Sequence, residues 1–279
     1  MGPVHLTVSD LERSLAYYRK VVGLDVLEQD ADRASLGADS TELLGLVEQP
    51  GAQPSDGYTG LFHFALLVPD RPALARWLTH AVRDEVPLTG LSDHYVSEAI
   101  YLRDPDRHGI EIYADRPREL WEGRVGERMT TEPLDVKDLL GEADGDFDGM
   151  PAGTTMGHVH LKVALIPQTV EFYRDVLGFD LVVERVPQAA FLSAGGYHHH
   201  LGANTWESAG APPPPAASAA LRHATVVLPS GEARDDAVRR VADAGQEPEA
   251  TATGTLVRDP SGNAVLLTAT SDPASAQTQ

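Results

Sequence analysis

Hydrophobic and polar residues follow the same order twice along this chain. The segment VHLTVSDLERSLAYYRKVVGLDV, which begins at Val4, aligns without a gap with VHLKVALIPQTVEFYRDVLGFDL, which begins at Val159. In both segments, alternating apolar residues predict a strand, and apolar residues at helical spacing then predict a helix. Gly23 and Gly178 stand where each helix should end, because glycine readily adopts the left-handed conformation of a helix C-terminus. Each copy should therefore begin with a strand, a helix and a second strand.

The later parts of the two halves repeat as well. GLFHFALLVP in the first half matches ALRHATVVLP in the second, and RDPDRHGIEI matches RDPSGNAVLL. Self-similarity of this kind indicates that one structural unit occurs several times. We therefore expect four units of the order βαβββ, at 3–48, 60–113, 157–204 and 220–268.

This pattern predicts an α+β fold. Within the second and fourth units, helices are expected at Arg71–Val82 and Glu232–Ala244. The segment between the halves contains prolines and an acidic patch and should be a linker with one short helix, Val136–Leu140. The chain thus divides into a first half, a linker, a second half and a disordered tail, at 1–113, 114–156, 157–269 and 270–279.

The composition restricts both chemistry and partners. The chain has 279 residues, no cysteine and a formal net charge of −20. Without cysteine there are no disulfides, thiolate nucleophiles or iron–sulfur clusters, so any metal must be held by histidine and carboxylate. The negative charge argues against nucleic acid or an anionic membrane as a partner. No apolar run is long enough to cross a membrane, and the first residues read as a strand, so we expect a cytoplasmic protein.

The stretch from Asp93 to Tyr113 concentrates residues with potential chemistry. Tyr101 begins an extended run, and Glu111 lies between two isoleucines in what should be a half-buried strand. Burying a carboxylate in such a strand costs free energy unless a positively charged group pairs with it. A metal ion or an arginine could be the positive partner of Glu111.

The repeat also provides an internal comparison. His5 and His160 occupy equivalent positions, so we expect them to be structural strand histidines. His63 and His223 are also equivalent to each other, so the comparison does not show whether either one belongs to a site. Residues found in one copy only are more readily tied to a site. These are Tyr101, Glu111, His158 and His200, whose counterparts are Leu256, Leu266, Pro3 and approximately Leu44.

The paired units, the helix endings YYRKVVGL and FYRDVLGF, and the later DPDRHG and DPSGN turns resemble the vicinal oxygen chelate superfamily. This superfamily includes glyoxalase I, fosfomycin and bleomycin resistance proteins, and extradiol ring-cleaving dioxygenases. The phrases DHYVSEAIYL, GIEIYADRP, LDVKDLL and SAGGYHHHLGANTW look like its two-module bacterial catechol-2,3-dioxygenases of the CatE type. The resemblance covers nearly the whole chain and implies two modules whose mixed sheets form cups. The fold itself does not select one chemistry.

The resemblance also implies where metal ligands would lie. Superfamily ligands come from the first strand and the end of one unit, and from two strands of the partner unit. Carried onto this chain, those positions are His158 and His200 in the third unit, and His63 and Glu111 in the second. If the second unit pairs with the third, all four candidate ligands lie in one module, and the other module has almost none. We therefore expect crossed pairing, which some members of the superfamily use.

Similarity to extradiol dioxygenases implies Fe(II) bound by His63, Glu111 and His158, because two histidines and a carboxylate leave positions open for substrate and dioxygen. The same residue types also suit Mn(II), Zn(II) or Ni(II). His200 would be the acid–base residue that takes a proton from the substrate, or alternatively a fourth, glyoxalase-like ligand. Alternation along the histidine run would place His198 on the same face as His200.

Tyr101 lies ten residues before Glu111, the spacing of the substrate-binding tyrosine in extradiol enzymes, and its alternative role is a core aromatic. His94 resembles a further pocket histidine, with a loop histidine as the alternative. The expected partners are dioxygen and a small aromatic substrate, a catechol or a hydroquinone, and the sequence is compatible with a homodimer.

Three other interpretations remain open at this point. One is a glyoxalase-type metal-dependent isomerase or lyase, and another is a metal-free small-molecule binding protein of the resistance type. The third keeps dioxygenase chemistry in an uncrossed module that uses His158, His200 and His223.

Overall fold

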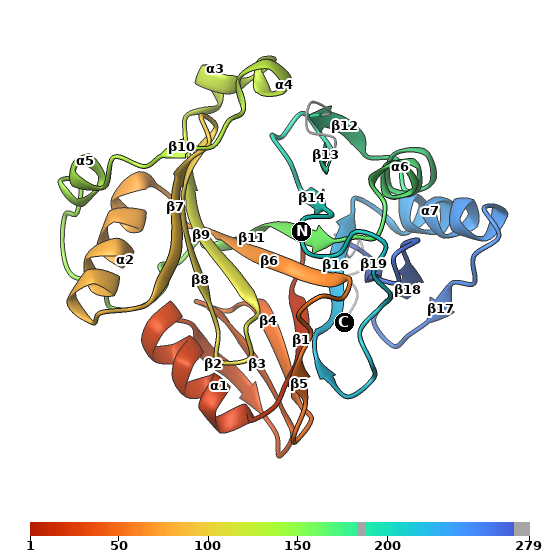
Figure 1. Cartoon of the computed structure of the whole chain (residues 1–279), viewed down its shortest axis with the longest axis horizontal. Coiled ribbons are helices and arrows are strands. Elements are labelled where there is room, and N and C mark those ends of the chain that lie inside the picture. Colours follow the sequence, from red (N-terminus) through yellow and green to blue (C-terminus); the bar gives the residue numbers. More distant parts are fainter. Residues whose placement is uncertain (184–187, 271–279) are drawn as a thin grey trace, which may run out of the picture.

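The computed structural model describes residues 1–183 and 188–270, which form two large mixed sheets with helices on their outer sides (Figure 1). The predicted disordered tail falls, from residue 271 onward, outside the described residues. In sheet order, the eight-stranded sheet contains β17 (Glu249–Ala250), β18 (Thr255–Arg258), β19 (Ala264–Ala269), β16 (Leu221–Leu228), β1 (Val4–Val8), β4 (Thr41–Glu48), β3 (Arg33–Ala38) and β2 (Asp25–Gln29).

The nine-stranded sheet contains, in order, β10 (Glu132–Pro133), β7 (Leu88–Asp93), β8 (Ser97–Arg103), β9 (Gly109–Asp115), β6 (Gly60–Leu67), β11 (Thr155–Lys162), β14 (Leu201–Asn204), β13 (Ala189–Ser193) and β12 (Asp180–Val183). A small two-stranded sheet pairs β15 (Ser218–Ala219) with β5 (Gln53–Pro54). The α-helices are α1 (Leu11–Tyr17), α2 (Arg71–Arg83), α3 (Arg118–Trp121), α4 (Val125–Arg128), α5 (Val136–Leu140), α6 (Ile166–Glu171) and α7 (Gly231–Asp243).

Each large sheet joins one unit from each half of the sequence. In the eight-stranded sheet, β1 of the first unit pairs antiparallel with β16 of the fourth, with His5 opposite His223. In the nine-stranded sheet, β6 of the second unit pairs antiparallel with β11 of the third, with His63 opposite His160. The predicted crossed pairing is therefore confirmed. The α+β fold is confirmed as well.

The repeated helices form and end where their sequences predict. α1 and α6 each continue into a short π-helix, Tyr18–Val22 and Phe172–Val176. Gly23 and Gly178 then adopt φ angles of 91° and 89°, which glycine enters without steric cost. α2 begins at the predicted residue, where Asp70 caps it by accepting a hydrogen bond from the backbone N–H of Ala73 at 2.8 Å.

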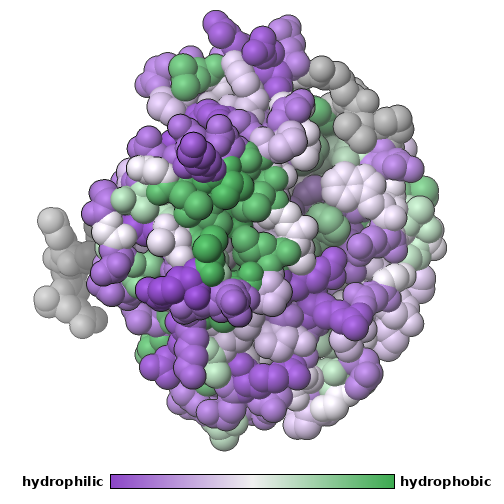
Figure 2. Space-filling view, turned by 60° about the vertical axis from the view of Figure 1, so that its left-hand side comes forward, coloured by the Kyte–Doolittle hydropathy of each residue, from purple (hydrophilic) through white to green (hydrophobic). Residues whose placement is uncertain are grey.

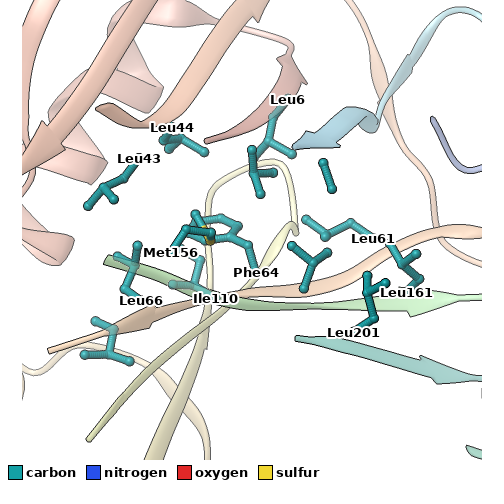
Figure 3. Close-up of a cluster of buried hydrophobic side chains, with 14 of the residues drawn as sticks. Leu6, Leu43, Leu44, Leu61, Phe64, Leu66, Ile110, Met156, Leu161 and Leu201 are labelled. Atoms are coloured by element: carbon teal, nitrogen blue, oxygen red, sulfur yellow. The ribbon is translucent and has the colours of Figure 1, made fainter. Parts of the chain in front are cut away.

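All four units share one hydrophobic core. Figure 3 shows Leu6 and Leu44 of the first unit near Phe64 of the second and Leu161 of the third. Burying a leucine or phenylalanine side chain contributes about 1.5–3 kcal/mol, so separating the units would expose many such side chains at once. The two sheets are therefore held together by the same residues that form their strands.

A repeated turn ties the two units of each half together. Tyr18 donates a hydrogen bond to Asp104 at 2.8 Å, and Tyr173 donates to Asp259 at 3.3 Å. Each tyrosine belongs to the first unit of its half, and each aspartate closes the turn before the last strand of the second. The halves are thus linked internally through these buried pairs, while the sheets link one half to the other.

The linker has more structure than its sequence predicts. α5 matches the predicted short helix, but α3, α4 and β10 were not expected, and β10 extends the nine-stranded sheet by pairing with β7. Elements of two to four residues are too short to show a helical or strand period. Trp121 is 2% exposed and packs in a buried cluster with Val96, so the linker packs onto the second unit.

Two further features concern the helices and the surface. No helix within residues 1–183 and 188–270 has the length and apolar character needed to cross a membrane. The face shown in Figure 2 is mostly hydrophilic; its largest hydrophobic area lies near the centre, and smaller ones lie toward the edges.

Candidate metal centre and cavity

A β-bulge at Gly157 turns His158 toward a cavity. The register between β11 and β6 shifts between Met156 and His158, so Gly157 is an extra residue in β11. Side chains normally alternate between the faces of a strand, and an extra residue reverses that order. Met156 is therefore buried in the core at 3% exposure, whereas His158 lines the cavity.

A second bulge in the facing strand has a similar effect. The register shifts again between His160 and Leu161, which leaves Phe62 without a partner in β11. As a result, the consecutive residues Phe62 and His63 both line the cavity. In β9, Glu111 lies directly opposite Tyr101 of β8, and both of these line it too.

These strands bring two imidazoles to one carboxylate. His63 Nε2 lies 3.0 Å, and His158 Nε2 3.1 Å, from the same Oε2 atom of Glu111. The three ligand atoms lie within 4.8 Å of one another, and all three side chains are buried. The structure thus brings together the three residues that the sequence predicts as ligands, two from the second unit and one from the third.

The electrostatics of this cluster favour an ionised carboxylate. Burial alone would raise the pKa of Glu111, but His158 and His63 hold that pKa well below its ordinary value. Burial lowers the pKa of His158, and the attraction of Glu111 offsets only part of that effect. An anionic carboxylate therefore faces a neutral His158 imidazole at neutral pH.

The cluster has the properties of a divalent metal site. Metal ligation requires an ionised carboxylate and neutral imidazoles. Glu111 and His158 meet these requirements. His63 Nε2 is buried and has no hydrogen-bond partner of good geometry, and a bound cation would satisfy it. Two histidines and one carboxylate that leave other positions open are typical of non-haem Fe(II) sites.

Tyr101 and His94 form a hydrogen-bonded pair beside the cluster. His94 Nδ1 lies 2.8 Å from the backbone oxygen of Thr130, and His94 Nε2 lies 2.7 Å from Tyr101 Oη. A carbonyl oxygen only accepts, so Nδ1 of a neutral His94 carries the proton and Nε2 accepts from the tyrosine. Burial raises the pKa of Tyr101 well above its ordinary value, so its hydroxyl stays protonated. Both residues lie in the cavity, as predicted from the sequence.

The linker supplies part of the cavity wall, through residues 129–131. It also holds the loop that carries His94. Tyr95 has a φ of 69°, which is rare for a bulky residue, and Asp93 Oδ1 accepts a hydrogen bond from its backbone N–H at 2.8 Å. Tyr95 Oη in turn donates to the backbone oxygen of Leu120 at 2.8 Å. No pattern in the sequence indicates this role of the linker, because the role depends on contacts between distant segments.

His199 rather than His200 lines the cavity. The ring of His199 lies 4.1 Å from that of His158, measured between centroids. His200 Nδ1 instead accepts a hydrogen bond from the backbone N–H of Ala194 at 3.2 Å, and burial lowers the pKa of His200 to about 4. Residues 197–200 precede β14 and are not part of a strand, so the alternation used to predict their faces does not apply. The structure does not bring His200 to the predicted ligands.

A chain of hydrogen bonds orients His199. His198 Nε2 lies 2.8 Å from Asp115 Oδ1, and His198 Nδ1 lies 2.8 Å from His199 Nδ1. The carboxylate accepts the proton on His198 Nε2, so Nδ1 of a neutral His198 is an acceptor and His199 Nδ1 donates to it. This leaves the lone pair of His199 Nε2 free. Burial keeps the pKa of His199 well below its ordinary value, so the ring is neutral.

Three other histidines, His5, His160 and His223, lie in strands of the two sheets. His160 is buried and lines the cavity, with its ring 5.0 Å from that of His63. His5 and His223 stack in the eight-stranded sheet, with ring centroids 4.4 Å apart. His158 and His223 therefore belong to different sheets, which argues against the uncrossed set of ligands.

The cavity has a volume of about 640 Å³. Its lining has two kinds of surface. The polar end contains the histidine–carboxylate cluster with Tyr101, His94 and His199. The rest is largely apolar and aromatic, with Phe62, Met129, Val183, Ala189, Phe191 and Trp206.

Gly157→Ala is expected to destabilise the fold by about 1–3 kcal/mol, because there is no room for a methyl group. A Cβ at Gly157 would lie 1.9 Å from Tyr113 Oη, and Tyr113 is fully buried and hydrogen-bonded to Tyr197 Oη at 2.8 Å. Chemical denaturation would measure the loss. The control is Gly231→Ala at the start of α7, where a Cβ meets nothing within 4 Å. Equal stability of the two variants would contradict the tight contact at the bulge.

The metal-free protein is expected to lose stability as the pH falls from about 6.5 toward 4. Burial, followed by the charges of His5 and Arg222, lowers the pKa of His223 from 6.5 to about 4 in the folded protein. The unfolded chain binds the proton at higher pH than the folded chain, so acid favours unfolding in this window. Thermal unfolding across this range should show a smaller loss for His223→Phe than for the parent. An equal loss would argue against this contribution.

Comparisons with known proteins agree with this fold. The sequence profile of the Glyoxalase/Bleomycin resistance protein/Dioxygenase superfamily matches residues 1–112 and 155–267. A protein named catechol-2,3-dioxygenase from Bacillus subtilis (strain 168) is 44% identical over 277 residues, which cover 95% of each chain. Among solved structures, a putative dioxygenase from Bacillus subtilis has a TM-score of 0.65 at 17% identity and covers 98% of this chain and 86% of its own.

Glyoxalase I from Zea mays has a TM-score of 0.61 at 17% identity, with 96% of this chain and 91% of that chain covered. At this identity the likeness concerns the fold alone. The sequence profile, in contrast, covers both halves and leaves out the linker. The chain therefore belongs to the glyoxalase/bleomycin resistance protein/dioxygenase superfamily.

Proposed function

We propose that this protein is an Fe(II)-dependent extradiol dioxygenase that opens the ring of a catechol or hydroquinone. His63, Glu111 and His158 would hold the metal. The observation that carries the proposal is the convergence of two buried imidazoles on one Glu111 oxygen, at 3.0 and 3.1 Å, inside a cavity of about 640 Å³. The name of the 44% identical relative supports the reaction type.

When bound, Fe(II) would supply one centre at which an aromatic diol and dioxygen come together and exchange electrons. The chain provides the surroundings for that chemistry. Burial of the cluster keeps bulk water away, and the aromatic walls of the cavity can hold a flat ring. Residue types alone leave Mn(II), Zn(II) and Ni(II) as other occupants of the same three ligands.

His199 would act as the proton acceptor. Its neutral Nε2 has a free lone pair, because its Nδ1 donates to the His198 ring, which Asp115 orients. A substrate hydroxyl can transfer its proton to this nitrogen, and His199 can return the proton to the ring-opened product. Tyr101 would place its protonated hydroxyl beside the oxygen atoms of the substrate, with His94 fixing the orientation of that hydroxyl.

The glyoxalase-type isomerase remains the alternative function for this fold. Its proposed fourth ligand, His200, does not line the cavity, and its Nδ1 accepts from a backbone N–H. A metal-free binding protein would leave the buried His63 Nε2 without a hydrogen-bond partner of good geometry, which is costly without a cation. Both observations favour a metal-dependent dioxygenase.

Oxygen labelling tests the proposal directly. Protein loaded with Fe(II) under anaerobic conditions should take up one dioxygen for each catechol consumed. In ¹⁸O₂, the ring-opened product should carry both labelled atoms. Metal analysis of the purified protein provides the second measurement. Nickel or zinc in the site together with no oxygen uptake on any catechol or hydroquinone would favour the isomerase.

A further inference from the structure

We propose that the natural substrate is an uncharged catechol or hydroquinone that carries a bulky apolar substituent, of which an aryl ring is the simplest form. The inference rests on the proposed function and concerns the part of the cavity beyond the histidine–carboxylate cluster. It identifies Phe62, Phe191 and Trp206 as the residues that select this substituent.

The size of the cavity is the first argument. A volume of about 640 Å³ lies within the range of roughly 300–1,000 Å³ that encloses a drug-sized ligand. A single diol ring at the polar end would fill only part of it. The remaining apolar walls would then face water, which is unfavourable in proportion to the apolar area left exposed.

The arrangement of the aromatic side chains is the second argument. Trp206 meets Phe62 edge to face, with ring centroids 5.3 Å apart and an interplanar angle of 75°. The His160 ring links this pair to Phe191, with centroids 5.7 Å from Trp206 and 5.6 Å from Phe191. The Phe191 ring in turn lies 5.1 Å from that of His199. Rings in these orientations prefer an aromatic partner in edge-to-face or offset contact.

The exposure of Trp206 supports the same conclusion. Its side chain is 51% exposed, whereas Trp77 and Trp121 are 0% and 2% exposed. An apolar substituent that reaches from the polar end toward the mouth of the cavity would cover it. The wall is already in place, so little ordering of side chains would oppose binding.

The charges around the cavity argue against an acidic substituent. Among the described residues that line it, Arg103 is the one with a permanent positive charge, and Glu207 lies 3.8 Å from its guanidinium. The chain as a whole carries a formal charge of −20, which repels anionic ligands. A neutral substituent is therefore favoured over a carboxylate.

Binding to the metal-free protein tests the inference without any turnover. Catechol, a phenyl-substituted catechol and a carboxymethyl-substituted catechol would be titrated by calorimetry, with tryptophan fluorescence as a second signal. The phenyl compound should bind about ten- to a hundredfold more tightly than catechol, because a second ring is removed from water. It should also change the fluorescence of Trp206, since the other two tryptophans are buried.

Trp206→Ala should remove much of the preference for the phenyl compound, and Trp206→Phe should retain most of it. Leu165→Ala is the matched control, because Leu165 is also half exposed and does not line the cavity. Equal affinity for catechol and the phenyl compound, or tighter binding of the carboxymethyl compound, would overturn the inference. Tight, Trp206-dependent binding would uphold it even if the iron-loaded protein consumed no oxygen, in which case only the proposed reaction would fail.

Discussion

Glu111→Gln is expected to weaken metal binding by at least about tenfold and to abolish oxygen uptake with it. Glutamine keeps the shape of the side chain but removes the negative charge that faces His63 and His158. Two neutral imidazoles alone would bind a divalent cation much more weakly. Metal bound per chain after equilibrium dialysis at several free-metal concentrations measures the change.

Glu98→Gln provides the matched control for burial. Glu98 is also a buried carboxylate of the same sheet, at 5% exposure, but it pairs with Arg71 and Arg116 and does not line the cavity. Its replacement should cost stability and leave metal affinity unchanged. A Glu111→Gln protein that binds metal as the parent does would show that the metal lies elsewhere, as the uncrossed arrangement requires.

His199→Gln is expected to lower the rate of ring opening by about a hundredfold or more, which is typical of the loss of a positioned general base. The metal content should stay the same, because His199 is not one of the three proposed ligands. Iron analysis combined with kcat from oxygen uptake separates the two effects. Glutamine can still donate a hydrogen bond to His198 from its amide, so the local packing is largely kept.

His200→Gln is the neighbouring control. His200 does not line the cavity, so this variant should keep kcat within about threefold of the parent. A large loss of activity in His200→Gln with little change in His199→Gln would reverse the assignment. Loss of metal in His200→Gln would instead indicate the four-ligand site of the isomerase.

The crossed pairing of units was predictable from a comparison of the two repeated halves. Glu111 and His158 have no polar counterpart in the other copy, and only pairing of the second and third units collects them in one cup. The strand patterns around both residues were strong enough to place them in β9 and β11. Most of the fold and all three candidate ligands were therefore predictable, because they lie in long segments with a clear hydrophobic period.

The features that the sequence did not predict depend on contacts between distant residues. The bulges at Gly157 and Phe62 arise from how β11 pairs with β6, and neither strand shows them alone. The choice between His199 and His200 depends on Gly195 and Gly196, whose φ angles of 62° and 69° form a turn just before the histidines. Alternation fails there because the chain has not yet entered a strand.

A crystal structure of the iron-loaded protein, with anomalous scattering measured at the iron edge, would show which side chains bind the metal. We expect one peak coordinated by His63 and His158 through Nε2 and by a carboxylate oxygen of Glu111, with His199 facing the open side. A peak coordinated by His200, or one located in the eight-stranded sheet near His5 and His223, would contradict it.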